Sequence, residues 1–252
     1  MSDPGDEPAP APAADHVPEE GWVAQELRAE FPELRLLSTT IRAPAGGPRR
    51  SPPGVQARLR VLSDRFHGAH ALSMRRQAVP HAYRVFFREI GLDPDATRTP
   101  VEGAAFDRLF HGGYESRGLL HDALLLALVE TGVPVWALDA DAVRPPVGIR
   151  LAVRGERLGA GDLAHDLGVG QMVAADEDGP VALLFGDVAP SHRPGARTRR
   201  LLLFSVQVAG VPGIHAEEAL WSCGSTLSAA PDGATLSIRQ GGNRDGDGRR
   251  SS

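Results

Sequence analysis

The feature that most constrains this chain is a change of hydrophobic period near residue 132. Before it, residues 119–131 form the most apolar segment, long enough for a buried helix and closed by Gly132. After it, short apolar runs alternate with Gly, Pro and Asp turns, as strands do. Strands are expected at 135–138, 148–153, 171–175, 181–185 and 201–208. Helices first and strands afterwards predict an α+β fold, with helices packed on a largely antiparallel sheet or a sandwich.

Helices are also expected earlier in the chain. Residues 22–34 place apolar side chains at near-helical spacing, and residues 36–41 have the pattern of a strand that follows this helix. Further helices are predicted at 55–71, at 79–90 and from Pro100 to Leu109.

The two ends of the sequence have almost nothing to bury. Residues 1–20 are mostly Pro, Ala and acid, and residues 240–252 are Gly-rich and polar. We therefore expect disordered tails at 1–20 and 240–252 around one domain over residues 21–239.

Composition excludes several classes of protein. The chain has one cysteine, Cys223, and no lysine. An internal disulfide, a cysteine-clustered zinc site, a Walker-type phosphate loop and a Schiff-base lysine are therefore excluded. His67 and His70 have no carboxylate at metal-ligand spacing, so neither a metal nor another cofactor is expected. Without an apolar run near the ~20 residues of a membrane helix or a signal-peptide pattern, we expect a cytoplasmic protein with no membrane contact.

The charge is distributed unevenly along the chain. The net charge of −5 argues against broad affinity for nucleic acids. Residues 1–20 hold six acidic residues and no basic one, so the rest of the chain is close to neutral. The densest basic cluster is Arg193, Arg197, Arg199 and Arg200. Such a cluster is either a solvated face or a contact for RNA phosphates.

Four further side chains stand out by position. Asp122, near the start of the apolar helix, is either a helix cap or structural acceptor, which we favour, or a ligand contact. Arg98 and Glu102 lie four residues apart and are expected to form an ion pair across a helix start. His111 precedes two glycines, in a loop where a histidine could reach a ligand.

The order of motifs from Arg98 to Glu156 resembles that of a known family. The sequence shows R-T-P-V-E-G, then H-D-A-L, G-V-P-V, D-A-D and G-E. This order is similar to that of the B3/B4 domain of the phenylalanyl-tRNA synthetase beta subunit and its free-standing relatives, which show R-P-S-x-E-A-L, V-D-x-x-N, G-L-P-V, D-L-D and G-E. The resemblance covers roughly residues 31–226. The matching residues are Arg98, Glu102, Asp122, Gly132, Pro134, Asp139, Asp141, Gly155 and Glu156.

The resemblance implies a B3/B4-like β-sandwich core with flanking helices. In the synthetase, the strand and loop that match residues 184–198 line the editing pocket. The resemblance therefore makes Gly186, Asp187 and Thr198 pocket candidates, and Asp139 joins them as part of the D-A-D motif.

The sequence departs from the family at two places. Leu125 stands where the family has Asn, and Pro100 stands where it has Ser. The resemblance implies a free-standing module that binds tRNA or aminoacyl-tRNA, with hydrolysis of a mischarged ester in trans as its catalytic form. The alternatives are a non-catalytic module that binds a small molecule such as an amino acid, and a degenerate scaffold that contacts protein. The two departures favour binding without turnover.

Overall fold

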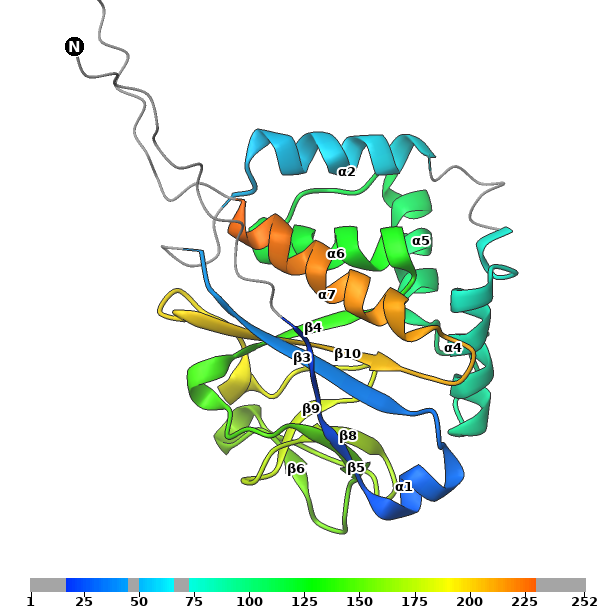
Figure 1. The fold of residues 1–252 in the computed structure, drawn as a ribbon, viewed down its shortest axis with the longest axis vertical. Coiled ribbons are helices and arrows are strands. Elements are labelled where there is room, and N and C mark those ends of the chain that lie inside the picture. The colour runs from blue at the N-terminus through cyan, green and yellow to red at the C-terminus, as the bar shows by residue number, and fades with distance from the viewer. Residues whose placement is uncertain (1–16, 45–49, 66–72, 230–252) are drawn as a thin grey trace, which may run out of the picture.

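Two four-stranded sheets and a layer of helices make up the structure, a computed structural model that describes residues 17–44, 50–65 and 73–229. The predictions for residues 1–16 and 230–252 and for the His67–His70 pair lie outside the described residues. Figure 1 shows three layers, with helices α2, α6 and α7 on one side, β3, β10 and β4 in the middle, and β5, β8 and β9 on the other side.

The middle sheet is antiparallel throughout. Its strands, in spatial order, are β1 (Glu19–Glu20), β3 (Arg35–Arg42), β10 (Arg200–Gln207) and β4 (Val135–Asp139). The central pair runs in register over eight residues, from Arg200 opposite Arg42 to Gln207 opposite Arg35. Six consecutive residues of β10 are buried, because helices cover one face of this sheet and the second sheet covers the other.

The outer sheet carries the rest of the strands and a small ribbon. Its order is β2 (Trp22–Val23), β5 (Gly148–Leu151), β8 (Met172–Ala175) and β9 (Pro180–Leu183), and only the β2–β5 pair is parallel. The ribbon pairs β6 (Arg157–Leu158) with β7 (His165–Asp166). A Cβ atom on Gly148 would lie 2.1 Å from the Trp22 ring, so the parallel pair requires glycine there.

Helix α7 packs on the middle sheet, and the other helices of that layer pack around α6. They are α1 (Gln25–Glu30), α2 (Pro53–Arg65), α4 (Ala78–Glu89), α5 (Pro100–His111), α6 (Leu119–Thr131) and α7 (Gly213–Ser228). Helix α6 lies between α2, α5 and α7 and also contacts β4, which explains why most of its residues are apolar. It ends at Gly132, whose φ of 77° is left-handed, as the sequence predicts. None of the described helices is both long and apolar enough to cross a membrane.

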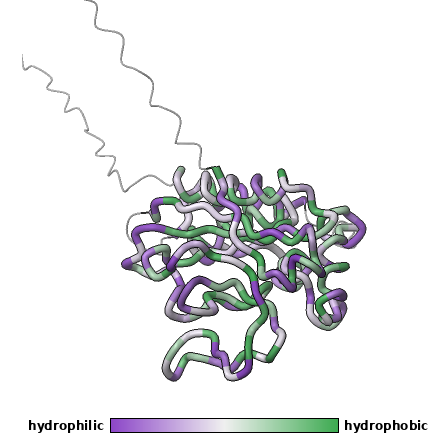
Figure 2. The backbone as a smooth tube through the Cα atoms, turned by 60° about the horizontal axis from the view of Figure 1, so that its bottom comes forward, coloured by the Kyte–Doolittle hydropathy of each residue, from purple (hydrophilic) through white to green (hydrophobic). Residues whose placement is uncertain are grey.

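The α+β fold class expected from the sequence is confirmed. Each of the five strands predicted after residue 132 is present to within about two residues at its ends, a normal uncertainty for element boundaries. Figure 2 shows hydrophobic and hydrophilic stretches alternating along the backbone.

Some details of the predicted elements are wrong. The expected helix at 22–34 is split. Trp22 and Val23 pair with β5 and form β2, so only Gln25–Glu30 is helical. Glu19 and Glu20, expected in the tail, pair with β3 as β1. Helix α7 has no sequence pattern that predicts it, although it buries one side against α6 and the middle sheet.

Candidate functional site

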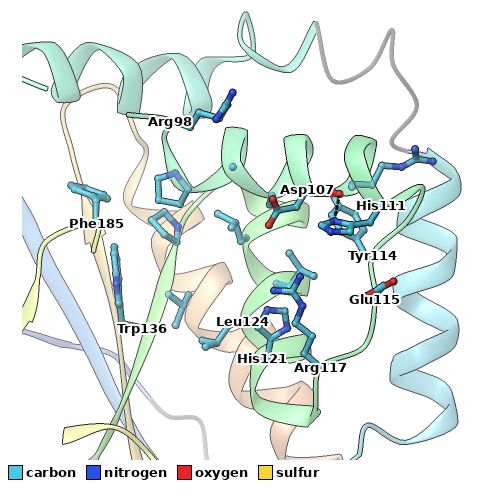
Figure 3. Close-up of a pocket in the computed structure, with 18 of the residues that line it drawn as sticks. Arg98, Asp107, His111, Tyr114, Glu115, Arg117, His121, Leu124, Trp136 and Phe185 are labelled. Carbon is cyan, nitrogen blue, oxygen red and sulfur yellow. Dashed lines mark hydrogen bonds between the residues drawn. The ribbon is translucent and has the colours of Figure 1, made fainter. Parts of the chain in front are cut away.

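A cavity of about 440 Å³ lies between α5, the loop that joins α5 to α6, helix α6, the start of β4 and the turn after β9. We call it the α5–α6 cavity. Its apolar lining includes Pro100, Leu124, Leu125, Leu128, Pro134, Trp136 and Phe185. Its charged or titratable lining is Arg98, Asp107, Arg108, His111, Glu115, Arg117 and His121. Figure 3 shows Trp136 and Phe185 on one side, with His121 and Arg117 on the other.

Phe185 forms the aromatic side of this cavity. Its φ of 59° is the one left-handed value at a non-glycine residue among those described. Its ring centre lies 5.1 Å from that of Phe87, 5.6 Å from that of Trp136 and 5.7 Å from that of Tyr83. These edge and tilted contacts hold the ring in place against the strained backbone.

Trp136 continues the aromatic side from strand β4. Its ring stacks on Phe204 of β10, with centres 5.1 Å apart and planes 8° apart. Its indole Nε1 donates a hydrogen bond to the Gly186 carbonyl oxygen at 3.3 Å. The tryptophan therefore ties the turn after β9 to the middle sheet and presents a fixed aromatic surface to the cavity.

Asp122 lies outside the cavity and contacts Arg117 and His121, which line the side opposite the aromatic residues. It is fully buried, and its carboxylate accepts hydrogen bonds from Ser51 Oγ and Ser116 Oγ, both at 2.5 Å, and from the Arg117 amide at 2.9 Å. His121 Nδ1 lies 3.3 Å from the same carboxylate. Burial acts to raise the pKa of Asp122, but the hydrogen bonds outweigh it and lower the pKa below its ordinary value. Asp122 is a structural acceptor, which holds Arg117 and His121 at the cavity.

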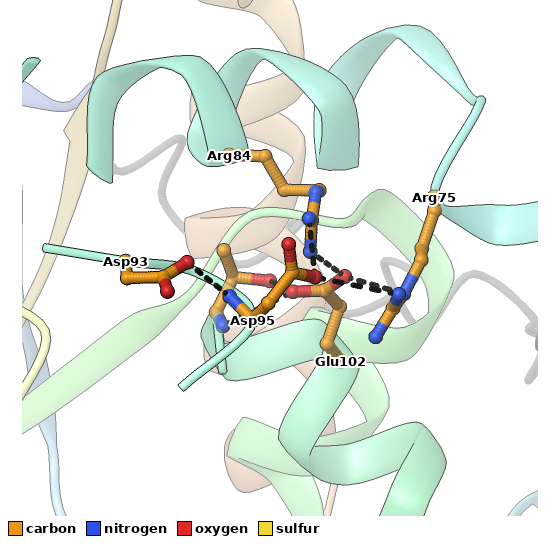
Figure 4. A network of polar contacts seen from close by, with 6 residues as sticks. Arg75, Arg84, Asp93, Asp95 and Glu102 are labelled. Atoms are coloured by element: carbon orange, nitrogen blue, oxygen red, sulfur yellow. Dashed lines mark hydrogen bonds and ion pairs between the residues drawn. The ribbon is translucent and has the colours of Figure 1, made fainter. Parts of the chain in front are cut away.

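Glu102 is also buried, in a network of charged side chains behind α5 (Figure 4). Arg84 Nη1 donates to its carboxylate at 2.6 Å, and Arg75 Nε lies 2.9 Å from it. Thr99 and Glu102 form a capping box at the start of α5. Arg84 also reaches Asp95 at 2.8 Å, and its hydrogen bond is the main cause that lowers the pKa of Asp95. The network joins α4 to α5, one wall of the cavity.

The predicted ion pair between Arg98 and Glu102 is wrong. Because α5 begins at Pro100, Arg98 lies outside the helix, and Glu102 already pairs with Arg84 and Arg75. The Arg98 guanidinium instead lies 4.1 Å from the ring centre of Phe106, while the residue lines the cavity.

His111 lies at the end of α5 and lines the cavity. Its Nδ1 lies 2.9 Å from the Asp107 carbonyl oxygen of the preceding turn. The residue is exposed.

The remaining pocket candidates, Asp139, Asp187 and Thr198, lie outside the α5–α6 cavity. Thr198 Oγ1 donates to Asp139 Oδ2 at 2.6 Å, and Asp139 accepts from the Asp141 amide at 3.1 Å. Thr198 lines a separate hollow of about 40 Å³. Asp187 is exposed, 3.9 Å from Arg193. The last lining residue of the cavity in the turn after β9 is Gly186.

The arginine cluster lies on the surface, partly paired. Arg200 donates to Asp141 at 2.6 Å, and Arg193 donates to the Val188 carbonyl oxygen at 3.0 Å. Arg197 and Arg199 are exposed, and their side chains make no hydrogen bond or ion pair with another described residue.

The sequence thus identified part of the cavity. Arg98, His111 and Gly186 line it, as do both positions where the sequence departs from the family, Pro100 and Leu125. Sequence reasoning missed Trp136, Phe185, Arg117 and His121. Aromatic residues make up only 5% of the chain. Trp136 next to G-V-P-V and Phe185 next to Gly186 were therefore the sequence signals that could have identified the aromatic side of the cavity.

Comparison with known proteins gives a partial match. No model of a protein family matches the sequence. The chain is 37% identical over 98 residues to the phenylalanine--tRNA ligase beta subunit of Xylella fastidiosa (strain Temecula1 / ATCC 700964), and 38% identical over 94 residues to that of Xanthomonas campestris pv. campestris (strain 8004). Part of this chain is similar to a ligase beta subunit. Each match covers 37% of this chain and 12% of the subunit, so the chain spans only a small part of these relatives.

Proposed function

We propose that this protein is a B3/B4-type module that binds the 3′ end of a tRNA, free or aminoacylated, in the α5–α6 cavity. The observation that carries the proposal is the division of this cavity into an aromatic side and an arginine and histidine side. The partial similarity to phenylalanine--tRNA ligase beta subunits supports tRNA as the ligand class.

The two sides of the cavity suit the two parts of such a ligand. Trp136 and Phe185 form a rigid surface for an apolar aminoacyl group or a base. Arg117 and His121 present cationic or hydrogen-bonding groups to a phosphate or ester. The cavity volume of about 440 Å³ is in the range of sites for small ligands, so it takes the end of a tRNA and not its body.

Binding without hydrolysis is the form of this function that we propose. Ester hydrolysis requires fixed donors around the developing oxyanion and a positioned water. Pro100 and Leu125 line the cavity where the family places Ser and Asn, and neither side chain can donate a hydrogen bond. Proline also lacks a backbone N–H.

A free amino acid is the second candidate ligand. Asp107 and Glu115 line the same cavity as Arg98 and Arg117, so acceptors for an ammonium group and donors for a carboxylate are both present. This arrangement would bind a zwitterion without RNA.

Equilibrium binding of a labelled tRNA(Phe) tests the proposal. The tRNA is presented uncharged, charged with Phe and mischarged with Tyr, with deacylation followed in the same samples. We expect saturable binding, weaker by about tenfold in Arg117→Gln, since a hydrogen bond to a charged group contributes roughly 1.5–3 kcal/mol. Arg28→Gln, on the exposed surface of α1, is the control and should bind normally. Binding of free phenylalanine but of no tRNA would transfer the function to the second candidate, and rapid deacylation would overturn binding without turnover.

A further inference from the structure

Helix α5 exposes a row of large apolar side chains beside the cavity. Phe106 is 46% exposed, Leu109 45% and Phe110 75%. The two phenylalanine rings are stacked, with centres 6.2 Å apart and planes 15° apart. Residues four apart share one helix face, so the rings form a continuous strip. Exposed apolar groups gathered in this way mark a contact surface.

The aromatic strip borders the cavity directly. Phe106 lies three residues after Gly103, and Phe110 lies three residues after Asp107, so each ring is one turn from a residue that lines the cavity. Arg98, which lines the cavity, also covers the Phe106 ring at 4.1 Å. The strip is therefore an extension of the cavity rim.

A guanidinium and an imidazole contact the strip. Arg98 contacts Phe106, and His111 meets the Phe110 ring edge to face at 5.0 Å. Arg117 and His121 line the cavity beyond them. An aromatic surface combined with arginine suits single-stranded nucleic acid, because every base has a flat face that can stack and every nucleotide carries a phosphate.

We propose that Phe106 and Phe110 are a stacking platform for unpaired bases of the RNA end whose terminus enters the α5–α6 cavity. This inference rests on the proposed function and adds the single-stranded character of the ligand. A protein partner suits the strip less well. Three partly exposed side chains on one helix supply far less than the ~800 Å² that each partner of a stable protein interface buries.

Two RNA hairpins of the same stem separate stacking from general RNA binding. One carries four unpaired nucleotides at its 3′ end, and the other is blunt. Their affinities are measured by fluorescence anisotropy for the wild type and for Phe106→Leu/Phe110→Leu, which keeps apolar bulk but removes both rings. Trp221→Leu is the matched control, because it removes an exposed ring from α7, which contributes no residue to the cavity.

We expect the double variant to bind the unpaired end about tenfold to a hundredfold more weakly, the range for loss of base stacking. Its affinity for the blunt hairpin and its salt dependence should match those of the wild type, because no charge is removed. The control should be unchanged.

Three results overturn the platform. In the first, the double variant binds the unpaired end with normal affinity, while Arg117→Gln still weakens RNA binding. This result excludes the platform and leaves the proposed function intact. Equal losses on both hairpins show that the rings do not read the unpaired end. In the third, the wild type sediments as a dimer, and the double variant sediments as a monomer with normal RNA affinity. This result assigns the strip to self-association. If the wild type binds neither hairpin nor tRNA, the proposed function itself fails.

Discussion

At the scale of single residues, two buried carboxylates hold the walls of the cavity without lining it. Asp122 joins the start of α6 to the segment before α2, and Glu102 joins α5 to α4. Both match the family motifs, yet both act on neighbouring protein groups. Their direct partners assign them a supporting role.

Replacing Asp122 with Ala should destabilise the fold by about 2–4 kcal/mol, because buried hydroxyl and amide donors lose their acceptor. Its pKa is lowered in the folded protein, so its contribution to the free energy of unfolding is present above about pH 4 and is lost as the pH falls through the folded pKa. Asp122→Asn should remove that part of the acid dependence. Urea unfolding between pH 3 and 7 measures both effects. A free energy of unfolding unchanged in both variants would show that Asp122 does not support the wall.

Glu102→Gln should cost about 3–5 kcal/mol, because it leaves the buried Arg84 guanidinium without its main counter-charge. Asp95→Asn is the matched control, since it removes an exposed acid from the same arginine and should cost much less. Urea unfolding at neutral pH compares them. Equal losses would contradict the central place of Glu102 in the network.

At the scale of elements, α7 provides the half of the helical layer that packs beside α6. Leu220 is fully buried there, and its neighbour Trp221 is largely exposed. Leu220→Ala should therefore cost about 2–5 kcal/mol, the range for a large-to-small change in a core. Trp221→Ala should cost little. Chemical denaturation measures both, and the reverse order would mean that α7 packs with its other face.

The sequence predicts the elements that carry strong local signals. Helix α6 has a continuous apolar run and a terminal glycine, and α5 has Pro100 and Glu102 in its first turn. Helix α7 lacks such signals. It contains Gly213, Gly224 and several serines and threonines, which lower intrinsic helix propensity, so packing against α6 must stabilise it.

The cavity could be predicted only in part for a similar reason. Arg98, His111 and Gly186 lie in motifs or glycine-rich turns and were found. Trp136 and Phe185 lie 49 residues apart in sequence and meet only because the turn after β9 contacts β4, which no local sequence pattern predicts.

At the scale of the whole molecule, the arginine cluster and the cavity are separate features that one RNA could contact. The hollow lined by Thr198 and Gly195 also contains Leu119 and Leu120 of α6. The arginine loop therefore lies near the end of α6 that carries His121.

Replacing Arg197, Arg199 and Arg200 with Gln should weaken tRNA binding and make it less dependent on salt. Each phosphate contact contributes roughly 0.7–0.9 to the slope of log affinity against log salt. Because Arg200 already pairs with Asp141, we expect the slope to decrease by the contribution of about two phosphate contacts instead of three. An unchanged slope in the triple variant would remove the cluster from the RNA contact.

The central claim is that the end of the RNA enters the α5–α6 cavity. The chain has three tryptophans, so replacing Trp22 and Trp221 with Phe leaves Trp136 as the sole tryptophan, at the aromatic wall. We expect its fluorescence to change saturably when Phe-tRNA(Phe) is added. The midpoint of this change should equal the midpoint measured by anisotropy. In Arg117→Gln, the half-maximal change should require more tRNA. Binding seen by anisotropy with no change in Trp136 emission would contradict the claim.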